Sequence, residues 1–272
     1  GMLILQAVLM DARKDWGKKA GQRPRWLRSI LATNREHARK HGHAHALRVS
    51  ASEPILQQWQ IKACGKKTES VCKKENEREN FNWEKHMMMA EYLLSPQNFS
   101  HVFMLDADAV LVKPEHDTLR HLAEVLEAKG KDVFLTDEDW LPKDHGGAGR
   151  INGGLIFVKN TEFTRGLFQD TFDAHVLGGK ALAHWRIGVR NMGCSSNEQI
   201  CLNDLWRGTG QAQFGPKAMM ASGLKYNRGA ERGGIDHIDD EKVYIMHFMG
   251  GSKGSADQAL CHKVRQQRLM GE

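Results

Sequence analysis

The sequence predicts an α/β fold built on a largely parallel sheet that helices cover on both faces. Continuous apolar runs at 3–10, 102–105 and 243–248 are typical of strands that are buried on both faces. Segments with a helical spacing of apolar residues lie between these runs. The two patterns alternate along the chain, as expected when helices form the crossovers between parallel strands.

The order of elements follows from these patterns. Strands are expected at 3–10, 43–49, 101–113, 132–136, 151–159 and 243–248. Helices are expected at 24–40, 81–94, 114–129, 160–176 and 198–206, with Gly42 ending the first of them. The triple methionine at 87–89 is expected to fill the core, and the tail at 256–270 is expected to form a basic helix on the surface.

Composition bounds the class of protein. The 272 residues are 40% hydrophobic and 26% charged, which fits one large globular domain or two small ones. A net charge of +6 suits an anionic ligand. The segment at 62–80 interleaves basic with acidic residues, so no clean basic stripe indicates a nucleic-acid partner. No stretch approaches the roughly 20 apolar residues that cross a bilayer.

Cysteine and histidine patterns leave alternatives open. The five cysteines contain no CxxC pair, and a disulfide is possible for Cys64 with Cys72 and for Cys194 with Cys201. Histidines alternate at 41–45, which invites a zinc site. Because closed zinc sites need a full set of converging ligands, a purely structural role is favoured for these histidines.

Two carboxylates interrupt the strand expected at 101–113. Asp106 and Asp108 flank Ala107, after one apolar run and before another. Desolvating two acids without a partner is costly. Aspartates at the end of a buried strand can converge on a hard divalent cation. A turn with two solvated acids is the alternative, and this motif alone does not decide between them.

The segment HFMGGSK supplies companions for the two aspartates. His247 ends a strand, Gly250 and Gly251 let the backbone approach a bulky ligand, and Lys253 supplies a mobile cation. The two carboxylates and the imidazole suit Mn²⁺ or Mg²⁺, with phosphate oxygens completing the coordination. Lys253 and the glycine amides would hold the same diphosphate. A core histidine followed by a glycine turn is the alternative.

Four segments in order resemble the GT-A glycosyltransferases. LDADAVLV resembles their DxD strand, INGGLIFVKN their N-x-G strand, NEQICLNDL the acid-Gln helix start of the retaining members, and HFMGGSK their H-x-x-G-x-x-K diphosphate loop. ATNREHARKHGHAHALRV is similar to the helix–strand unit near the family N-terminus, so the resemblance spans residues 31–253. As a whole, the sequence resembles the retaining galactosyl-, mannosyl- and xylosyltransferases of the fungal and plant Golgi. The His-Gly-Lys spacing also resembles glycogenin and a bacterial galactosyltransferase group.

The resemblance implies a GT-A (nucleotide-diphospho-sugar transferase) fold with a mixed, mostly parallel sheet flanked by helices. It implies a single domain over 2–272, with a donor-binding half at about 2–115, an acceptor half at about 116–255 and a C-terminal surface helix at about 256–272. Such an enzyme moves a hexose or pentose from a UDP- or GDP-linked sugar to a glycan or a protein- or lipid-linked acceptor. It uses Mn²⁺ or Mg²⁺ and retains the anomeric configuration. Gly1 before Met2 is typical of a residue added for expression, so a natural anchor could have been removed. The location would then be the Golgi lumen for a eukaryotic protein, and otherwise the cytoplasm.

The resemblance also implies roles for individual residues. The metal ligands would be Asp106, Asp108 and His247. The residues around the donor would be Lys85, Ala107, Asp137, Asn152, Gly153, Gly154, Gly250, Gly251 and Lys253. Glu198 and Gln199 would lie beneath the anomeric carbon as the catalytic pair.

Several of these roles have alternatives. Lys85 is expected either to reach the ribose or diphosphate or to be a surface lysine. Glu198, where the family often has Asp, could be only a helix-terminal acid that the dipole favours. Trp140, His184 and Trp185 are candidates for stacking on an acceptor sugar, although tryptophans more often serve packing.

Mechanism and class also have alternatives. Retention could arise from acceptor attack on the leaving-group face or from a covalent intermediate on Glu198. A sugar-1-phosphate nucleotidyltransferase is disfavoured because 10–23 contains no compact Gly-rich phosphate loop. A non-catalytic nucleotide-sugar-binding subunit is disfavoured because the DxD aspartates, His247 and Lys253 are all present.

Overall fold

The structure is a computed structural model that describes residues 1–8, 24–49, 82–138, 150–176, 198–208, 210–230, 238–261 and 263. The polar segment at 62–80, the Gly-rich stretch at 178–197 and the end of the tail lie outside these residues. So do Trp140, His184 and Trp185. Among the described helices, none combines the length and hydropathy needed to cross a bilayer.

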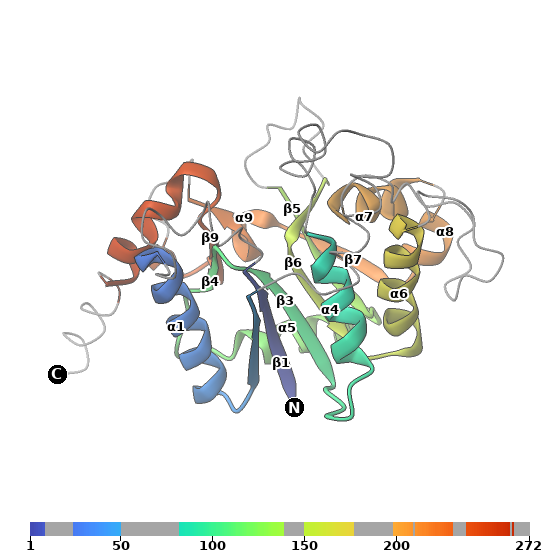
Figure 1. The fold of residues 1–272 in the computed structure, drawn as a ribbon, viewed down its shortest axis with the longest axis horizontal. Helices are drawn as coiled ribbons and strands as arrows, with labels where there is room; N and C mark the ends of the chain where they lie inside the picture. The colour runs from blue at the N-terminus through green and yellow to red at the C-terminus, as the bar shows by residue number, and fades with distance from the viewer. Residues whose placement is uncertain are drawn as a thin grey trace, which may run out of the picture.

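A six-stranded sheet forms the centre of the fold, in the order β2-β1-β3-β6-β5-β7 (Figure 1). β6 pairs antiparallel with both β3 and β5, and the other neighbours are parallel. This arrangement confirms the predicted mixed, mostly parallel sheet. The strands are β1 (Met2–Ala7), β2 (Ala44–Arg48), β3 (His101–Asp106), β5 (Val133–Asp137), β6 (Ile151–Lys159) and β7 (Ala218–Ala221).

Helices cover both faces of this sheet, as the sequence predicts. Core side chains of α4, α6 and α7 pack on one face, and those of α5 pack on the other. α1 lies beside β4, as Figure 1 shows. The helices are α1 (Arg25–Lys40), α4 (Trp83–Leu93), α5 (Thr118–Lys129), α6 (Glu162–Val176), α7 (Glu198–Arg207), α8 (Gln211–Phe214) and α9 (Gly223–Tyr226).

A second sheet of three short strands, in the order β4-β9-β8, accounts for one difference from the sequence prediction. Its strands are β4 (Ala109–Leu111), β8 (Arg228–Gly229) and β9 (Ile245–His247). The apolar run after the aspartate pair therefore does not continue β3. The chain turns at 107–108 and enters the second sheet. His247 ends a strand, as predicted, but this strand belongs to the smaller sheet.

Most predicted helices begin and end close to their expected bounds, and α5 shows why one does not. It begins at Thr118, four residues after the expected start, because the side chain of Asp117 accepts a hydrogen bond from the backbone N–H of Arg120. It ends at Gly130, which has the left-handed conformation with φ +60°. The short elements α8, β7, α9 and β8 were not predicted, because two to four residues are too few to show a period.

Alternating side chains of the central strands enter cores on the two faces. Leu3 and Leu5 belong to the cluster that contains α4, whereas Ile4 belongs to the cluster that contains α5. Met88 and Met89 are fully buried, which confirms that the methionine run fills the core.

The described start of the C-terminal tail forms a helix of which one face is buried. Residues 256–261 are helical. The side chains of Ala256, Ala259 and Leu260 are buried in a core cluster with Met246 and Phe248. One face of this helix therefore packs on the second sheet, because its apolar residues recur at helical spacing.

Candidate active site

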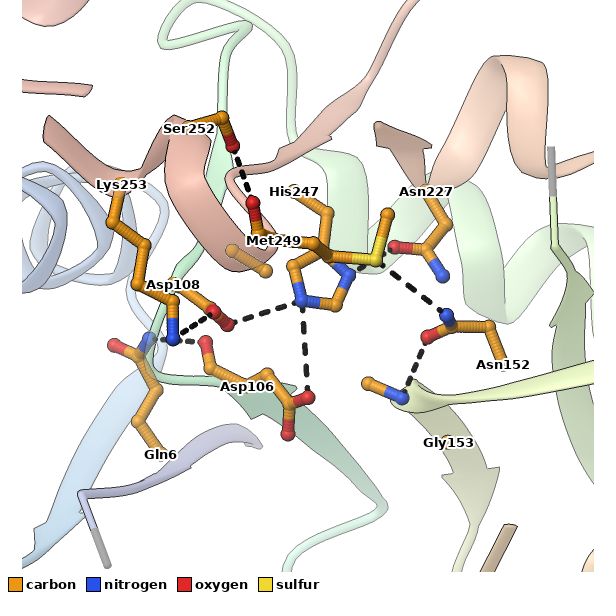
Figure 2. A network of polar contacts seen from close by, with 12 residues as sticks. Gln6, Asp106, Asp108, Asn152, Gly153, Asn227, His247, Met249, Ser252 and Lys253 are labelled. Carbon is orange, nitrogen blue, oxygen red and sulfur yellow. Dashed lines mark hydrogen bonds and ion pairs between the residues drawn. The ribbon is translucent and has the colours of Figure 1, made fainter. Parts of the chain in front are cut away.

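The two aspartates and His247 converge at the junction of the two sheets (Figure 2). His247 Nε2 lies 3.0 Å from Asp108 Oδ1 and 3.8 Å from Asp106 Oδ2. One ligand atom from each residue lies within 4.8 Å of the others. This is the only such group of three among the residues that the structure describes.

Strand pairing explains why residues so far apart in sequence meet. Asp106 ends β3, and Asp108 precedes β4, whose first residue, Ala109, is paired with His247 on β9. The buried side chain of Asn34 on α1 fixes β4. It donates to the carbonyl of Ala109 and accepts from the N–H of Leu111, both at 3.0 Å. The sequence did not single out Asn34.

A hydrogen-bond relay fixes the tautomer of His247. Its Nδ1 lies 2.9 Å from the amide oxygen of Asn227, whose amide nitrogen donates to Thr136 Oγ1 at 3.0 Å. Because the amide oxygen can only accept, Nδ1 carries the hydrogen and Nε2 faces the aspartates. Asn227 was also not predicted, since it follows a helix too short to recognise from the sequence.

Opposite charges shift the pKa values in this group. Burial opposes ionisation of Asp108, but His247 and Lys253 outweigh it and lower the pKa of this carboxyl. Burial of His247 alone would lower its pKa, but Asp108 and then Asp106 outweigh it and raise the pKa of the imidazole. A strong negative potential therefore surrounds His247 Nε2.

This donor set fits a divalent cation. Two carboxylates and one imidazole supply the oxygen and nitrogen ligands that Mn²⁺ and Mg²⁺ accept. The passing strand β6 leaves room for them, because a Cβ atom on Gly154 would lie 2.4 Å from His247 Cε1 and 2.8 Å from Asp106 Oδ2. A glycine is therefore required where β6 approaches the three ligands.

Lys85 of α4 lies beneath this group and is buried, with 3% of the residue exposed. Its Nζ lies 3.0 Å from Asp106 Oδ1, 2.9 Å from Glu198 Oε1 and 3.2 Å from the carbonyl oxygen of Gly153. Burial alone would lower the pKa of Lys85, but the two carboxylates raise it overall. The surface alternative is therefore wrong, because the ammonium group is buried among these three acceptors.

The first turn of α7 holds the expected catalytic pair. Glu198 is buried, with 2% of the residue exposed, and pairs with Lys85. The amide oxygen of Gln199 accepts from the N–H of Gly153 at 2.9 Å, and its amide nitrogen donates to Glu138 Oε1 at 2.7 Å. One turn later, Asn203 bonds the backbone of Ile151 through both ends of its amide. α7 is thereby fixed to the start of β6.

The antiparallel direction of β6 brings the N-x-G segment to the site. The carboxyl ends of β3 and β5 face the amino end of β6, because Leu105 is opposite Leu155 and Thr136 is opposite Asn152. Asn152 accepts from the N–H of Gly154 at 2.8 Å and faces Met249 Sδ (Figure 2). The structure thus brings these predicted donor-site residues together with the three predicted metal ligands.

Two adjacent acids at the end of β5 have different partners. Asp137, which the resemblance implied as a sugar ligand, accepts a hydrogen bond from the N–H of Gly223 at the start of α9. Glu138 is the acid that faces Gln199. Burial raises the pKa of Glu138, although Gln199 and then Arg150 oppose this shift.

The diphosphate segment forms a 3-10 helix, η3 (Gly250–Ser255), and not an extended loop. Lys253 Nζ lies 2.9 Å from Asp108 Oδ2 and 5.6 Å from the ring centroid of Trp26. The Lys253 side chain is 36% exposed, so it is far freer than Lys85. Ala107 packs beside Val8, Leu27 and Leu31 in the turn between the aspartates.

The alternating histidines have separate partners. His43 Nε2 lies 2.8 Å from Asp117 Oδ1, and His45 Nε2 lies 3.0 Å from Gln6 Oε1. His41 Nε2 faces the carbonyl oxygen of Pro114. These contacts agree with a structural role, although the acidic partner of His43 was not expected from sequence.

The described residues show the state of two of the five cysteines. Cys201 on α7 is disulfide-bonded, and Cys261 is free and exposed. Cys64, Cys72 and Cys194 lie outside the described residues.

The fold is similar to that of solved glycosyltransferases. A glycosyltransferase involved in the glycosylation of the major capsid of PBCV-1 matches with a TM-score of 0.52 and 10% identity, over 94% of this chain and 98% of that one. Mouse xyloside xylosyltransferase 1, in its apo form, matches with a TM-score of 0.44 and 8% identity, over 92% and 98%. The galactosyltransferase LgtC, in complex with donor and acceptor sugar analogues, matches with a TM-score of 0.47 and 10% identity, over 96% and 95%.

The match with a TM-score of 0.52 establishes the fold. The chain has the GT-A fold that its motifs predict, with a mixed sheet flanked by helices. No family model matches the sequence, and no curated protein matches it either.

Proposed function

We propose that this protein is a metal-dependent glycosyltransferase that uses a UDP- or GDP-linked hexose or pentose and retains the anomeric configuration. The acceptor is a hydroxyl group of a glycan or of a protein- or lipid-linked sugar. The observation that carries the proposal is the convergence of Asp106, Asp108 and His247, with Lys253 beside them, at one edge of a GT-A sheet.

The leaving group is the part of the reaction that this site is suited to stabilise. A cation held by Asp106, Asp108 and His247 supplies Lewis-acid stabilisation of negative charge on a departing diphosphate. Lys253 adds a second positive charge next to the carboxylate of Asp108. Its side chain, about a third exposed, has the freedom to follow a phosphate group. The N–H groups of Gly250 and Gly251 lie at the start of the same 3-10 helix.

The sugar side of the site supports retention. Lys85 bridges Asp106 and Glu198, so a buried carboxylate lies next to the metal-binding residues. A carboxylate there stabilises positive charge on the anomeric carbon in an oxocarbenium-like transition state. Pairing with Lys85 reduces the nucleophilicity of Glu198, which favours acceptor attack on the leaving-group face over a covalent intermediate.

The proposal is tested first by binding. UDP and GDP, and their galactose, xylose and mannose derivatives, are screened by thermal shift with and without Mn²⁺, because ligands of the native state raise its stability. We expect one nucleotide series to stabilise the protein only with the cation, and Asp108→Ala to abolish that effect in calorimetry. Glu115→Gln, which changes an exposed acid outside the site, is the matched control. Unchanged nucleotide affinity in Asp108→Ala would exclude this metal site.

Turnover then tests the stereochemistry. NMR of the product, or of the hydrolysed donor, should show the anomeric configuration of the donor. An inverted product would reject retention. Metal-dependent binding with neither transfer nor hydrolysis of any donor would indicate a nucleotide-sugar-binding subunit instead.

A further inference from the structure

A cavity of about 580 Å³, which we call the α9 cavity, lies beside the second sheet and outside the candidate active site. Residues between 224 and 228 and between 240 and 244 line it, and none of them is a predicted metal ligand or donor residue. Its Tyr244 wall directly precedes β9, whereas His247 ends that strand, about 10 Å further along. The α9 cavity is therefore distinct from the metal centre, and its volume is in the range of small-ligand pockets.

Backbone hydrogen bonds hold together the two segments that form the α9 cavity. The N–H of Tyr244 donates to the carbonyl of Lys225 at 2.8 Å, which joins the start of β9 to α9. The N–H of Val243 donates to the carbonyl of Asp240 at 3.0 Å, and the N–H of Lys242 donates to Asp240 Oδ1 at 2.8 Å. A closed turn and a helix thus fix the positions of the side chains around the cavity.

Two lysines place positive charge on the Tyr244 ring. The Nζ atoms of Lys113 and Lys225 lie 4.3 Å and 5.0 Å from the centroid of this ring. Neither lysine forms an ion pair with a carboxylate among the described residues. The ring of His121 stacks on Tyr244 with centroids 4.8 Å apart, and burial, followed by the charge of Lys225, lowers the pKa of His121. The potential beside this wall is therefore positive.

Cations also outnumber acids in the lining itself. Lys225, Arg228 and Lys242 line the α9 cavity together with Asp240 and Glu241. One oxygen of Asp240 is engaged by the backbone of its own turn, and Glu241 is exposed to solvent. Lys242 is exposed as well and has no ion pair with any carboxylate that the structure describes. A cavity in which one sign of charge prevails concentrates ligands of the opposite sign.

The α9 cavity also offers apolar surface. Leu224 lines it with 51% of the residue exposed, and Val243 lines it beside the Tyr244 wall. Small-ligand pockets typically combine such surface with a few charged groups that fix the orientation of the ligand. An inorganic anion would use the lysines but not the apolar surface. A ligand that uses both has an anionic group attached to a ring or chain.

We propose that the α9 cavity binds a sugar that carries an oxyanion, either a phosphate or a carboxylate group. The ammonium groups of Lys225 and Lys242 donate charge-assisted hydrogen bonds to the oxyanion. Leu224 and Val243 contact the C–H surface of the sugar ring. This site goes beyond the proposed function and does not rest on it, because it uses neither the metal ligands nor the donor residues.

Calorimetry on the full chain without added metal tests the proposal, with glucose 6-phosphate, glucuronate, glucose and inorganic phosphate as probes. We expect one or both anionic sugars to bind, inorganic phosphate to bind at least about tenfold more weakly, and glucose not to bind. Lys225→Gln should weaken binding of the anionic sugar about tenfold or more, the range for a lost hydrogen bond to a charged group. Lys129→Gln removes the same charge from an exposed position on α5 outside the cavity, so it is the matched control and should bind like the wild type.

Lys242→Gln is a second variant, at an exposed position where the change does not disturb the core. It should also weaken binding of the anionic sugar. The proposal is overturned if neither anionic sugar binds the wild type, if glucose or inorganic phosphate binds as tightly as they do, or if both lysine variants keep full affinity. Loss of binding in Lys253→Met with none in Lys225→Gln would place the anion in the proposed diphosphate site instead. Nucleotide binding with Mn²⁺ is measured separately, so the proposed function and this site can fail independently.

Discussion

On each side of the candidate metal centre a lysine pairs with an aspartate, but the two lysines differ in burial. On one side, the buried ammonium group of Lys85 contacts Asp106, Glu198 and a backbone carbonyl. On the other, Lys253 contacts Asp108 and lies over Trp26, with about a third of its side chain exposed. The first lysine is surrounded by fixed acceptors, and the second can exchange its partner. The difference indicates that the proposed sugar side of the site is rigid and that the proposed phosphate side is adaptable.

Burial decides how much each pair contributes to stability. Breaking a buried ion pair leaves an uncompensated charge and costs about 3–5 kcal/mol, whereas exposed pairs contribute about 0–1 kcal/mol. Two lysines that look alike in sequence therefore differ mainly in their surroundings. The comparison can be tested by changing each side in turn.

The largest effect is expected for Lys85→Met. This change leaves the carboxylates of Asp106 and Glu198 without their shared cation, so the free energy of unfolding should fall by about 3–5 kcal/mol. Urea denaturation at pH 7 measures the change. In the double variant Lys85→Met/Glu198→Gln, part of the loss should be recovered because one of the two carboxylates is neutral. If the free energy of unfolding of Lys85→Met fell by less than 1 kcal/mol, the ion pairs of Lys85 would not be what holds this side of the site rigid.

Gly154→Ala should have the next largest effect, because Gly154 lies between the two sides. Its Cβ would approach Asp106 and the ring of His247, neither of which can move without disturbing the ligands. Overpacking of this kind costs about 1–3 kcal/mol, and Mn²⁺-dependent nucleotide binding should be lost. Gly153→Ala is the matched control, since its Cβ would meet only side-chain atoms of Glu198 and Gln199, at 3.1 Å or more. Equal Mn²⁺-dependent binding by the two variants would contradict the required close approach of β6.

Lowering the pH should destabilise the phosphate side of the site through α1, which packs against β4. His37 on α1 is buried, both ring nitrogens lack hydrogen bonds among the described residues, and burial followed by the charge of His41 lowers its pKa to about 3. The unfolded chain binds a proton near pH 6.5 and the folded chain does not. Stability is therefore fully present above pH 6.5 and declines as the pH falls toward 3, by about 2 kcal/mol at pH 5.

His37→Met isolates this contribution. Denaturation of the variant and the wild type at pH 7 and pH 5 should show a smaller acid loss in the variant. The burial of His45 and His101, each with a pKa lowered to about 4, leaves some acid dependence in both proteins. An identical loss in both proteins would show that His37 is not buried in its neutral form.

Lys253→Met should have the smallest effect on folding. The pair with Asp108 is partly exposed, so the free energy of unfolding should change by no more than about 1 kcal/mol. Nucleoside diphosphate binding with Mn²⁺ should still weaken about tenfold, because a charge-assisted contact to phosphate is lost. An unchanged affinity for the nucleoside diphosphate would show that Lys253 does not contact the phosphates. A loss of several kcal/mol in the free energy of unfolding would show that Lys253 stabilises the fold as much as Lys85 does.

Local patterns predicted much of the fold and several groups of the site. Apolar runs and helical spacing located the longer strands and helices, because burial of one face or both imposes a short period. Asp106, Asp108 and His247 were predicted as one group because carboxylate and imidazole ligands at strand ends are chemically distinctive. The described elements between 208 and 244 are too short for such a period, so neither β8 nor the supporting Asn227 could be predicted.

The sequence by itself thus determined the fold class and the chemical groups available to the site. Only the tertiary structure decided which partner each group has. Asp108 meets His247 across 139 residues through β4 and β9, and Lys85 is buried because α4 packs against the sheet beneath Asp106. The partners of Asp137 and Glu138 differ because successive residues face opposite sides of a strand. Such pairings depend on strand register and helix packing, which join distant parts of the chain and leave no local pattern in it.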